Sequence, residues 1–229
     1  MPRFVMAESP VVNIERLYRD RFSADERSAK ALVWQVLCDD FFSRFVVASD
    51  TVLDIACGYG EFINAIRAEK RMAMDVNSDA GDFLDREVIF FNQSCESLDC
   101  IADNSVDVVF ESNAFEHFPS KVVLTRTVQE VHRKLRPGGR FIVMQPNIKY
   151  LAGAYWDFYD HYIPLSHLSC VELFQHCGFV IERVIPRFLP YTTKSRLPQA
   201  AALVRLYLAC PPAWRLLGKQ TLYVGRRPA

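Results

Sequence analysis

The sequence predicts an α/β fold built on one mostly parallel sheet of seven strands, in which the last strand is antiparallel. Three observations lead to this prediction. Strand-like runs alternate with helix-like segments from residue 51 to residue 186. A β-branched run ends at Asp54, and a turn containing Gly58 and Gly60 follows it and opens a helix-like segment. A further strand-like run lies close to the end of the chain. Alternating strands and helices favour a parallel sheet with right-handed crossovers and helices on both faces.

The elements are expected in the following order. A helical segment comes first, at residues 23–48, with apolar side chains at a spacing near 3.6 residues. The strand-like runs lie at 51–55, 71–75, 87–91, 106–111, 140–145, 179–185 and 221–224. Helix-like segments lie between them, at 61–69, 78–85, 121–135 and 168–177. Pro137 and the two glycines after it end one helix and begin the next strand.

Length and composition are typical of one globular domain, which we expect to span residues 1–229. Within it, we expect residues 1–48 to form a helical lid and residues 187–218 to form a basic and apolar insertion before the last strand. A formal net charge of zero argues against a nucleic-acid partner held by bulk electrostatics. Seven cysteines without a Cys-x-x-Cys pair, and no signal-peptide pattern, predict reduced thiols in a cytoplasmic protein.

Charge is distributed unevenly along the chain. No acidic residue follows Glu182, and the segment from Arg187 to Ala229 carries eight bases: Arg187, Lys194, Arg196, Arg205, Arg215, Lys219, Arg226 and Arg227. One interpretation is an amphipathic surface at 187–219 that contacts the inner face of a membrane or an anionic, lipid-linked substrate. The other is a helix that packs on the domain and extends its arginines into water. The sequence leaves both interpretations open.

The turn after the first strand predicts a nucleoside site. Glycine lets the backbone approach a ligand closely. A dinucleotide-binding fingerprint has a third glycine where this chain has Ile63. Glu61 stands where a pyrophosphate would bind and would repel it. Asp75 ends the second strand, where it can accept hydrogen bonds from a ribose diol. A nucleoside with a positive charge and no phosphate fits these features, and S-adenosylmethionine is such a molecule.

The stretch from Asp54 to Gly60 resembles the first motif of class I S-adenosylmethionine-dependent methyltransferases of the type 11, UbiE-like superfamily. Ala56 replaces the first glycine of that motif, and we expect a negative φ there. The run Leu135–Phe141 is similar to the turn that leads into the family's fifth strand. The resemblance covers residues 30–186 and the last strand. It implies a Rossmann-like fold, S-adenosylmethionine as cofactor and methyl transfer as the activity.

The resemblance also implies a set of cofactor contacts. Asp54 would lie near the donor's ammonium group, Asp75 would hold the ribose, and the loop around Ser94 would hold the adenine. Many members of the family carry Asp where this chain has Ser94. The full set is Asp54, Ala56, Cys57, Gly58, Gly60, Asp75, Val76, Ser94, Cys95, Glu96, Glu111 and Ser112.

Methyl transfer from a sulfonium is an in-line displacement, so the enzyme aligns the reactants and sometimes removes a proton. His117 is a candidate base, and its alternative role is packing or holding the donor. His161 and His167 lie with Asp160 in an aromatic loop after the fifth strand. That loop either binds the acceptor or covers the cofactor. A metal ion held by Asp160, His161 or His167 is not required by their spacing, and we predict none.

We therefore expect methyl transfer to an oxygen or nitrogen of a small-molecule acceptor that is sugar-like, anionic or lipid-linked. Two other classes of function are open to a chain of this kind. One is a non-catalytic protein that binds S-adenosylmethionine or acts as a scaffold. The other is a nucleotide-dependent oxidoreductase, which Glu61 and Ile63 disfavour. The sequence determines neither the acceptor nor the oligomeric state.

Overall fold

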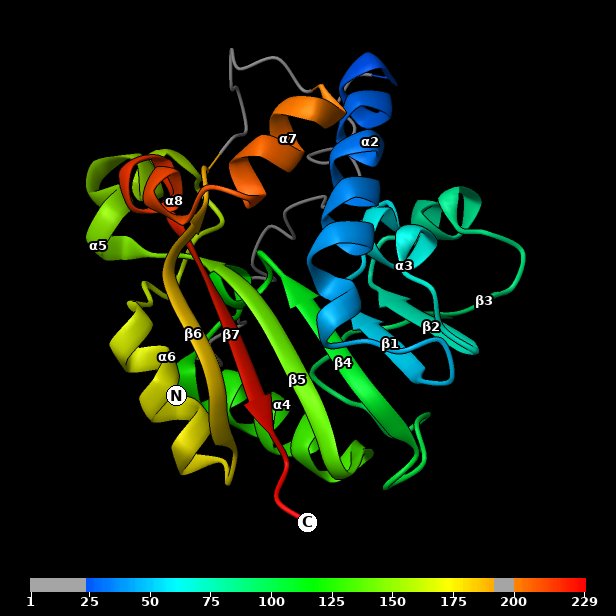
Figure 1. The fold of residues 1–229 in the computed structure, drawn as a ribbon. Helices are drawn as coiled ribbons and strands as arrows, with labels where there is room; N and C mark the ends of the chain where they lie inside the picture. Colours follow the sequence, from blue (N-terminus) through cyan, green and yellow to red (C-terminus); the bar gives the residue numbers. More distant parts are fainter. Residues whose placement is uncertain (1–23, 192–199) are drawn as a thin grey trace, which may run out of the picture.

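The computed structural model describes residues 24–191 and 200–229. Its sheet has seven strands in the order β3-β2-β1-β4-β5-β7-β6 (Figure 1). Strands β1 to β5 pair in parallel, whereas β7 is antiparallel to both β5 and β6. The strands are β1 (Thr51–Ile55), β2 (Lys70–Asp75), β3 (Val88–Asn92), β4 (Val106–Ser112), β5 (Leu135–Pro146), β6 (Val180–Leu189) and β7 (Gln220–Arg226). The predicted fold class is confirmed.

Helices cover both faces of the sheet, and each face has its own apolar core. On one face lie α2 (Ala24–Asp40), η1 (Phe42–Arg44), α3 (Glu61–Ala65), α7 (Ala201–Leu208) and α8 (Pro211–Leu217). On the other lie α4 (Lys121–Lys134) and α6 (His167–His176). Short elements connect them: η2 (Ser78–Phe83), η3 (Phe115–His117), α5 (Ile148–Leu151) and η4 (Ala152–Asp157).

Aromatic side chains fix α2 to the sheet. The ring of Phe62, from α3, stacks on the ring of Phe110, from β4, with their centroids 3.6 Å apart. Trp34 of α2 meets the same Phe110 ring edge-on at 5.8 Å. Burying each such side chain contributes about 1.5–3 kcal/mol. The second half of α2 therefore belongs to the core. Residues 1–23 of the expected lid lie outside the described residues, and the lid itself stays a prediction.

Element boundaries differ from the sequence prediction at several places. Strand β5 begins at Leu135 rather than residue 140, so Pro137 and the two glycines after it lie inside the strand. Helix α3 ends at Ala65 rather than residue 69, because Ile66 is already extended, with a ψ of 138°. The segment 78–85 forms a 3-10 helix that ends at Phe83. Strand β6 continues to Leu189, so the segment between the last two strands begins after 189 rather than at 187. Residues 192–199 of that segment lie outside the described residues.

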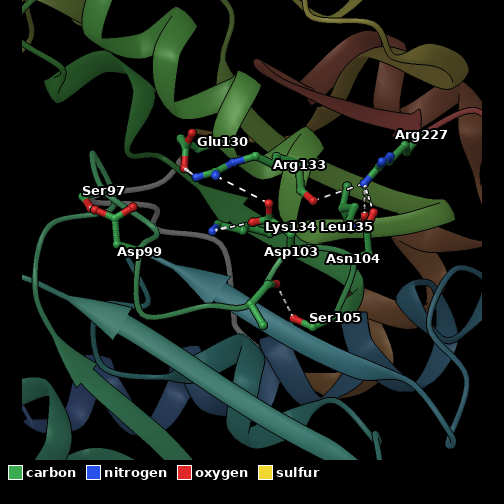
Figure 2. A network of polar contacts seen from close by, with 11 residues as sticks. Ser97, Asp99, Asp103, Asn104, Ser105, Glu130, Arg133, Lys134, Leu135 and Arg227 are labelled. Atoms are coloured by element: carbon green, nitrogen blue, oxygen red, sulfur yellow. Dashed lines mark hydrogen bonds and ion pairs between the residues drawn. The ribbon is translucent and has the colours of Figure 1, made fainter.

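A polar network fixes the edge of the sheet at which β4 begins (Figure 2). The ammonium of Lys134, a buried residue at the end of α4, donates to the carboxylate of Asp103 at 2.8 Å. The guanidinium of Arg227 donates to Asn104 Oδ1 at 2.7 Å and to the carbonyls of Arg133 and Leu135. These bonds tie the end of β7 to the end of α4. The opposite edge carries the carboxyl ends of β1, β2, β4 and β5, where ligands bind in open α/β sheets.

Candidate active site

The turn after β1 contains three residues with positive φ: Ala56 at 59°, Gly58 at 56° and Gly60 at 77°. The expected negative φ at Ala56 is therefore wrong. The turn must reverse direction at once while the Cys57 N–H reaches the Met74 carbonyl at 2.9 Å, and Ala56 takes the left-handed conformation at a cost of about 1–2 kcal/mol. A Cβ on Gly60 would lie 2.4 Å from the Leu84 side chain, whereas a Cβ on Gly58 would meet nothing within 4 Å. The space beside Gly58 is thus open to a ligand.

Asp75 holds this turn from the end of β2. One carboxylate oxygen accepts a hydrogen bond from the Gly58 N–H and the other accepts one from the Asn77 N–H, both at 2.8 Å. A carboxylate offers about four acceptor positions, so two remain for the hydroxyls of a ribose. Val76, the next residue, is half exposed. The geometry is thus compatible with the predicted ribose contact.

The mouth of the turn carries an excess of negative charge. Asp54 is buried, and burial raises its pKa well above the ordinary value, with further increases from Glu61 and Asp75. Burial also raises the pKa of Asp75, against the opposing effect of hydrogen bonds from the Asn77, Gly58 and Val76 backbone. Glu61 forms an ion pair with Lys30 of α2 at 2.8 Å. A ligand with positive charge relieves this repulsion, and a phosphate increases it. The sulfonium and ammonium of S-adenosylmethionine fit the site.

The loop predicted to hold the adenine follows β3. The hydroxyl oxygen of Ser94 accepts a hydrogen bond from the Glu96 N–H at 3.2 Å and so closes the turn. Cys95 is partly buried, and burial raises its pKa to about 12. Glu96 is exposed. The predicted role of Ser94 in adenine binding stays a prediction.

Unpaired oxygen atoms gather at the ends of β4 and β5. Glu111 is fully buried, and its Oε1 accepts hydrogen bonds from the Ala114 N–H at 2.5 Å and from Gln145 Nε2 at 3.2 Å. Its Oε2 has no hydrogen-bond partner among the described residues, and neither do Asn113 Oδ1 and Gln145 Oε1. Asn113 Nδ2 donates to Ser112 Oγ at 2.9 Å. Buried acceptors of this kind favour a ligand that donates hydrogen bonds, such as an ammonium or a hydroxyl group.

Two of the three predicted histidines lie together. The Nδ1 atom of His117 lies 2.9 Å from the Asp160 carbonyl oxygen and 3.3 Å from its carboxylate. The Nδ1 atom of His161 lies 2.8 Å from the Tyr155 carbonyl oxygen. The centroids of the two imidazole rings are 5.0 Å apart. The structure therefore joins His117 to the aromatic loop.

His167 lies apart from this pair, in the first position of α6. Its Nδ1 atom contacts Asn147 Nδ2 at 3.0 Å, and its ring stacks against Tyr150 with centroids 6.2 Å apart. Burial, followed by the charge of Lys149, lowers its pKa. Asn147 also bonds to Thr221 Oγ1, at 2.9 Å. His167 thus takes part in a polar cluster at the start of α6.

Comparisons with known proteins agree with this geometry. Residues 53–143 match the family model described as "Methyltransferase domain". This match agrees with the methyltransferase family and the S-adenosylmethionine cofactor that the sequence predicts. No curated protein sequence matches the chain.

Solved structures extend the similarity to nearly the whole fold of this chain. One is a methyltransferase from Haloferax volcanii in complex with the Trm112 methyltransferase activator, with a TM-score of 0.68 and 19% identity, over 94% of this chain and 99% of that one. Another is a SAM-dependent methyltransferase from Archaeoglobus fulgidus, with a TM-score of 0.66 and 17% identity, over 93% and 99% of the two chains.

Sequence reasoning missed several residues of the candidate site. Glu116 is buried beside His117. Burial raises the pKa of Glu116 to about 7, the attraction to His117 opposes this rise, and repulsion from Asp160 adds to it. The signal available was an acid placed between Phe115 and a histidine in an otherwise apolar stretch. Lys30 and Gln145 gave no comparable signal, because only the tertiary structure brings them to Glu61 and Glu111.

The basic residues of the last fifth do not form one patch. Because β7 is antiparallel to β5, Arg226 pairs with Arg140 at the end of the sheet opposite the turn that follows β1. Arg227 is the next residue and lies at the same end. Arg205 forms an ion pair with Asp40 at 3.1 Å. Arg187 donates to the Gly218 and Leu216 carbonyls, both at 2.8 Å. Lys194 and Arg196 lie outside the described residues. Arg215 and Lys219 lie in α8 and just after it, and the exposed leucines of α7 and α8 are Leu203, Leu206, Leu216 and Leu217.

The described residues contain no helix with the length and apolar character needed to cross a bilayer.

Proposed function

We propose that this methyltransferase moves a methyl group from S-adenosylmethionine to an oxygen or nitrogen of a small, sugar-like acceptor. The observation that carries this proposal is the cluster of buried acceptor atoms at the ends of β4 and β5. Glu111 Oε2, Asn113 Oδ1 and Gln145 Oε1 have no partner in the part of the chain that the structure describes. Hydroxyl or amino groups of a ligand are the natural partners of these atoms.

The cofactor is proposed to lie across the ends of β1 and β2. Asp75 holds the ribose hydroxyls with the lone pairs that its backbone donors leave unused. Asp54 faces the cationic end of the donor from beneath the glycine turn. The open space beside Gly58 admits the nucleoside. Ser94, Cys95 and Glu96 follow β3 on the side proposed for the adenine.

When bound, S-adenosylmethionine supplies a methyl group already activated by the positive sulfur. The protein must then align the acceptor and deal with its proton. His117 and His161 lie next to the end of β4, because η3 follows that strand directly. We assign acceptor activation to this pair. His167 is assigned a role in positioning the start of α6, on the evidence of its bond to Asn147.

The residues of α7 and α8 indicate which charge the acceptor carries. Exposed leucines on both helices, with Arg215 and Lys219 nearby in sequence, support contact with a lipid-linked acceptor or with an anionic membrane surface. A purely packing role for these helices is the alternative, and it is supported by the burial of Trp214 against Phe41 and Phe188.

A panel of hydroxyl- and amine-bearing acceptors tests the proposal, with S-adenosylhomocysteine release as the readout. His117→Ala should lower the turnover rate by about 10²–10⁴-fold while S-adenosylmethionine affinity stays unchanged. His176→Ala is the matched control, since His176 lies at the far end of α6 and is exposed. Full activity of this variant between pH 6 and 9 would show that His117 only packs and takes no part in acceptor activation. Binding of the cofactor without turnover of any acceptor would favour a non-catalytic S-adenosylmethionine-binding or scaffolding protein instead.

A further inference from the structure

We infer that Glu116, His117 and His161 form a binding site for one divalent transition-metal ion. Each of these residues offers a ligand atom, and the three atoms lie within 4.8 Å of one another. Glu116 and His117 lie in η3, and His161 lies in the loop after η4. The site differs from the set Asp160, His161 and His167 that the sequence suggested, because His167 lies apart at the start of α6.

The hydrogen bonds of the two imidazoles favour metal binding. A backbone carbonyl can only accept a hydrogen bond, so His117 Nδ1 must carry the proton that faces the Asp160 carbonyl. The same holds for His161 Nδ1 and the Tyr155 carbonyl. In this tautomer each ring has its lone pair on Nε2. Histidines that bind metals almost always donate their other N–H to a carbonyl or carboxylate in this way.

Glu116 supplies the charge that such an ion requires. The residue is buried, and its Oε2 has no hydrogen-bond partner among the described side chains and backbone. A buried carboxylate oxygen without a partner is costly, and a bound cation removes that cost. This oxygen is the second, independent indication of a ligand, because the two histidine hydrogen bonds do not involve it.

The backbone holds the three residues together. The Glu116 carbonyl accepts hydrogen bonds from the Tyr162 N–H at 2.7 Å and from the Ile163 N–H at 3.2 Å. The Tyr155 hydroxyl donates to the Ile163 carbonyl. The loop that carries His161 is thus tied to the turn that carries Glu116 and His117. A site fixed in this way loses little conformational freedom when an ion binds.

The ligand set indicates the class of ion. Two imidazole nitrogens and one carboxylate oxygen suit Zn²⁺, Fe²⁺ and related ions, whereas Mg²⁺ and Ca²⁺ prefer oxygen ligands alone. Zinc lies about 2.0–2.2 Å from such atoms, so tetrahedral ligands are roughly 3.3–3.5 Å apart. The side chains would therefore move together by about an ångström on binding. Three protein ligands leave one position open, as in catalytic zinc sites.

The open position gives the ion a use in the proposed function, and this step rests on that function. An acceptor hydroxyl that binds there would have its pKa lowered by the ion and would lose its proton to solvent. Its oxygen would then form a bond to the methyl carbon as the carbon–sulfur bond breaks, and S-adenosylhomocysteine would leave. The two histidines then act by holding the ion. Ion binding itself requires no assumption about the acceptor.

Zinc titration of the full chain tests the inference. The background carries Cys100→Ser and Cys210→Ser, because these two exposed thiols would bind zinc on their own. After removal of metal with a chelator, calorimetry and metal analysis of the gel-filtered protein measure affinity and stoichiometry. We expect one zinc ion per chain. Glu116→Gln and His161→Ala should each weaken zinc binding by more than about 10-fold. His176→Ala, an exposed histidine away from the cluster, should leave it unchanged.

S-adenosylmethionine affinity of each variant serves as the folding check, and zinc affinity is read only from variants that retain it. A background protein that binds no zinc overturns the inference without any variant. Zinc binding that survives both substitutions, or that falls equally in His176→Ala, overturns it as well. The result is independent of methyl transfer: a chain that binds zinc through these residues but methylates nothing refutes the proposed function alone. A metal-free chain that is fully active refutes the ion's role in methyl transfer alone.

Discussion

Replacing Asp75 should weaken cofactor binding strongly and the fold only moderately. Each oxygen of this carboxylate accepts one backbone hydrogen bond at 2.8 Å, from Gly58 or from Asn77. In Asp75→Asn, the amide nitrogen would face one of these N–H donors and could not accept its hydrogen. The variant therefore loses one anchor of the glycine turn together with the charged acceptor for the ribose.

The magnitude follows from the bonds that are lost. A hydrogen bond to a charged group contributes about 1.5–3 kcal/mol, so the affinity for S-adenosylmethionine should fall by roughly 10- to 150-fold. The effect on stability is smaller for a reason visible in the site. Burial raises the pKa of Asp75, so its ionised form is disfavoured in the folded protein, and the neutral amide escapes that cost. We expect an unfolding midpoint lower by about 2–4 °C.

Calorimetry with S-adenosylmethionine measures the affinity, and thermal unfolding without ligand measures the stability. Asp82→Asn is the matched control, since it makes the same change of charge on exposed η2. Unchanged affinity in Asp75→Asn would refute the ribose contact. An unfolding midpoint that falls by much more than the expected change of about 2–4 °C, with little loss of affinity, would show that Asp75 acts by holding the turn and not by binding the ribose.

Three further predictions concern charge. S-adenosylmethionine should bind more tightly as the pH rises from 5 to 8, because the raised pKa of Asp54 delays the negative charge that attracts the donor's ammonium and sulfonium. S-adenosylhomocysteine keeps the ammonium but has a neutral sulfur, so its affinity should rise less in the same calorimetric titration. Asp103→Asn should lower the unfolding midpoint by about 2–4 °C, since it leaves the buried ammonium of Lys134 without its anion. The pKa of Asp103 is lowered by Lys134, so this stabilisation is present above pH 4 and is lost as the pH falls through the lowered value; an acid-unfolding curve identical to wild type would contradict it. Serine at Arg215 and Lys219 should reduce sedimentation with anionic liposomes at low salt, and an unchanged sedimented fraction would exclude these bases as the contact.

The sequence predicted the positions of the strand ends well, and the residues proposed to hold the cofactor follow these ends. Parallel strands bring their carboxyl ends to one edge, so Asp54 and Asp75 had to be neighbours once the two strands were recognised. The seven strands were recognisable for a similar reason, since each is a short apolar run between turn residues. The φ at Ala56 was mispredicted because residue type alone did not show how tightly the turn must reverse.

The acceptor side could not be predicted in the same way. His161 and His167 looked equivalent in the sequence, because both follow β5 in one aromatic loop. The difference arises at Ser166, whose hydroxyl accepts from the Ser169 N–H and caps α6, so that His167 begins a helix. His161 instead stays in the loop that the Glu116 carbonyl ties to η3. Residues 45 positions apart in the chain thus meet through main-chain bonds that leave no signature in side-chain pattern.

The acidic residues of the candidate site repel an anionic acceptor, whereas the bases of the last segment attract it. Glu111 and Glu116 are buried at the end of β4 and in η3, and Asp54 lies beneath the cofactor turn. Two like charges 4 Å apart repel by about 4 kcal/mol at an effective dielectric constant near 20. Without a bound metal ion, a phosphate next to the reacting hydroxyl is therefore disfavoured, while one held beyond roughly 8–10 Å is screened from the acids. If the acceptor is anionic, its charge must lie toward α7 and α8. A matched pair of acceptors tests this argument: a sugar with its phosphate on the carbon next to the methylated hydroxyl should react far more slowly than one with the phosphate at the distal end, and equal rates would refute it.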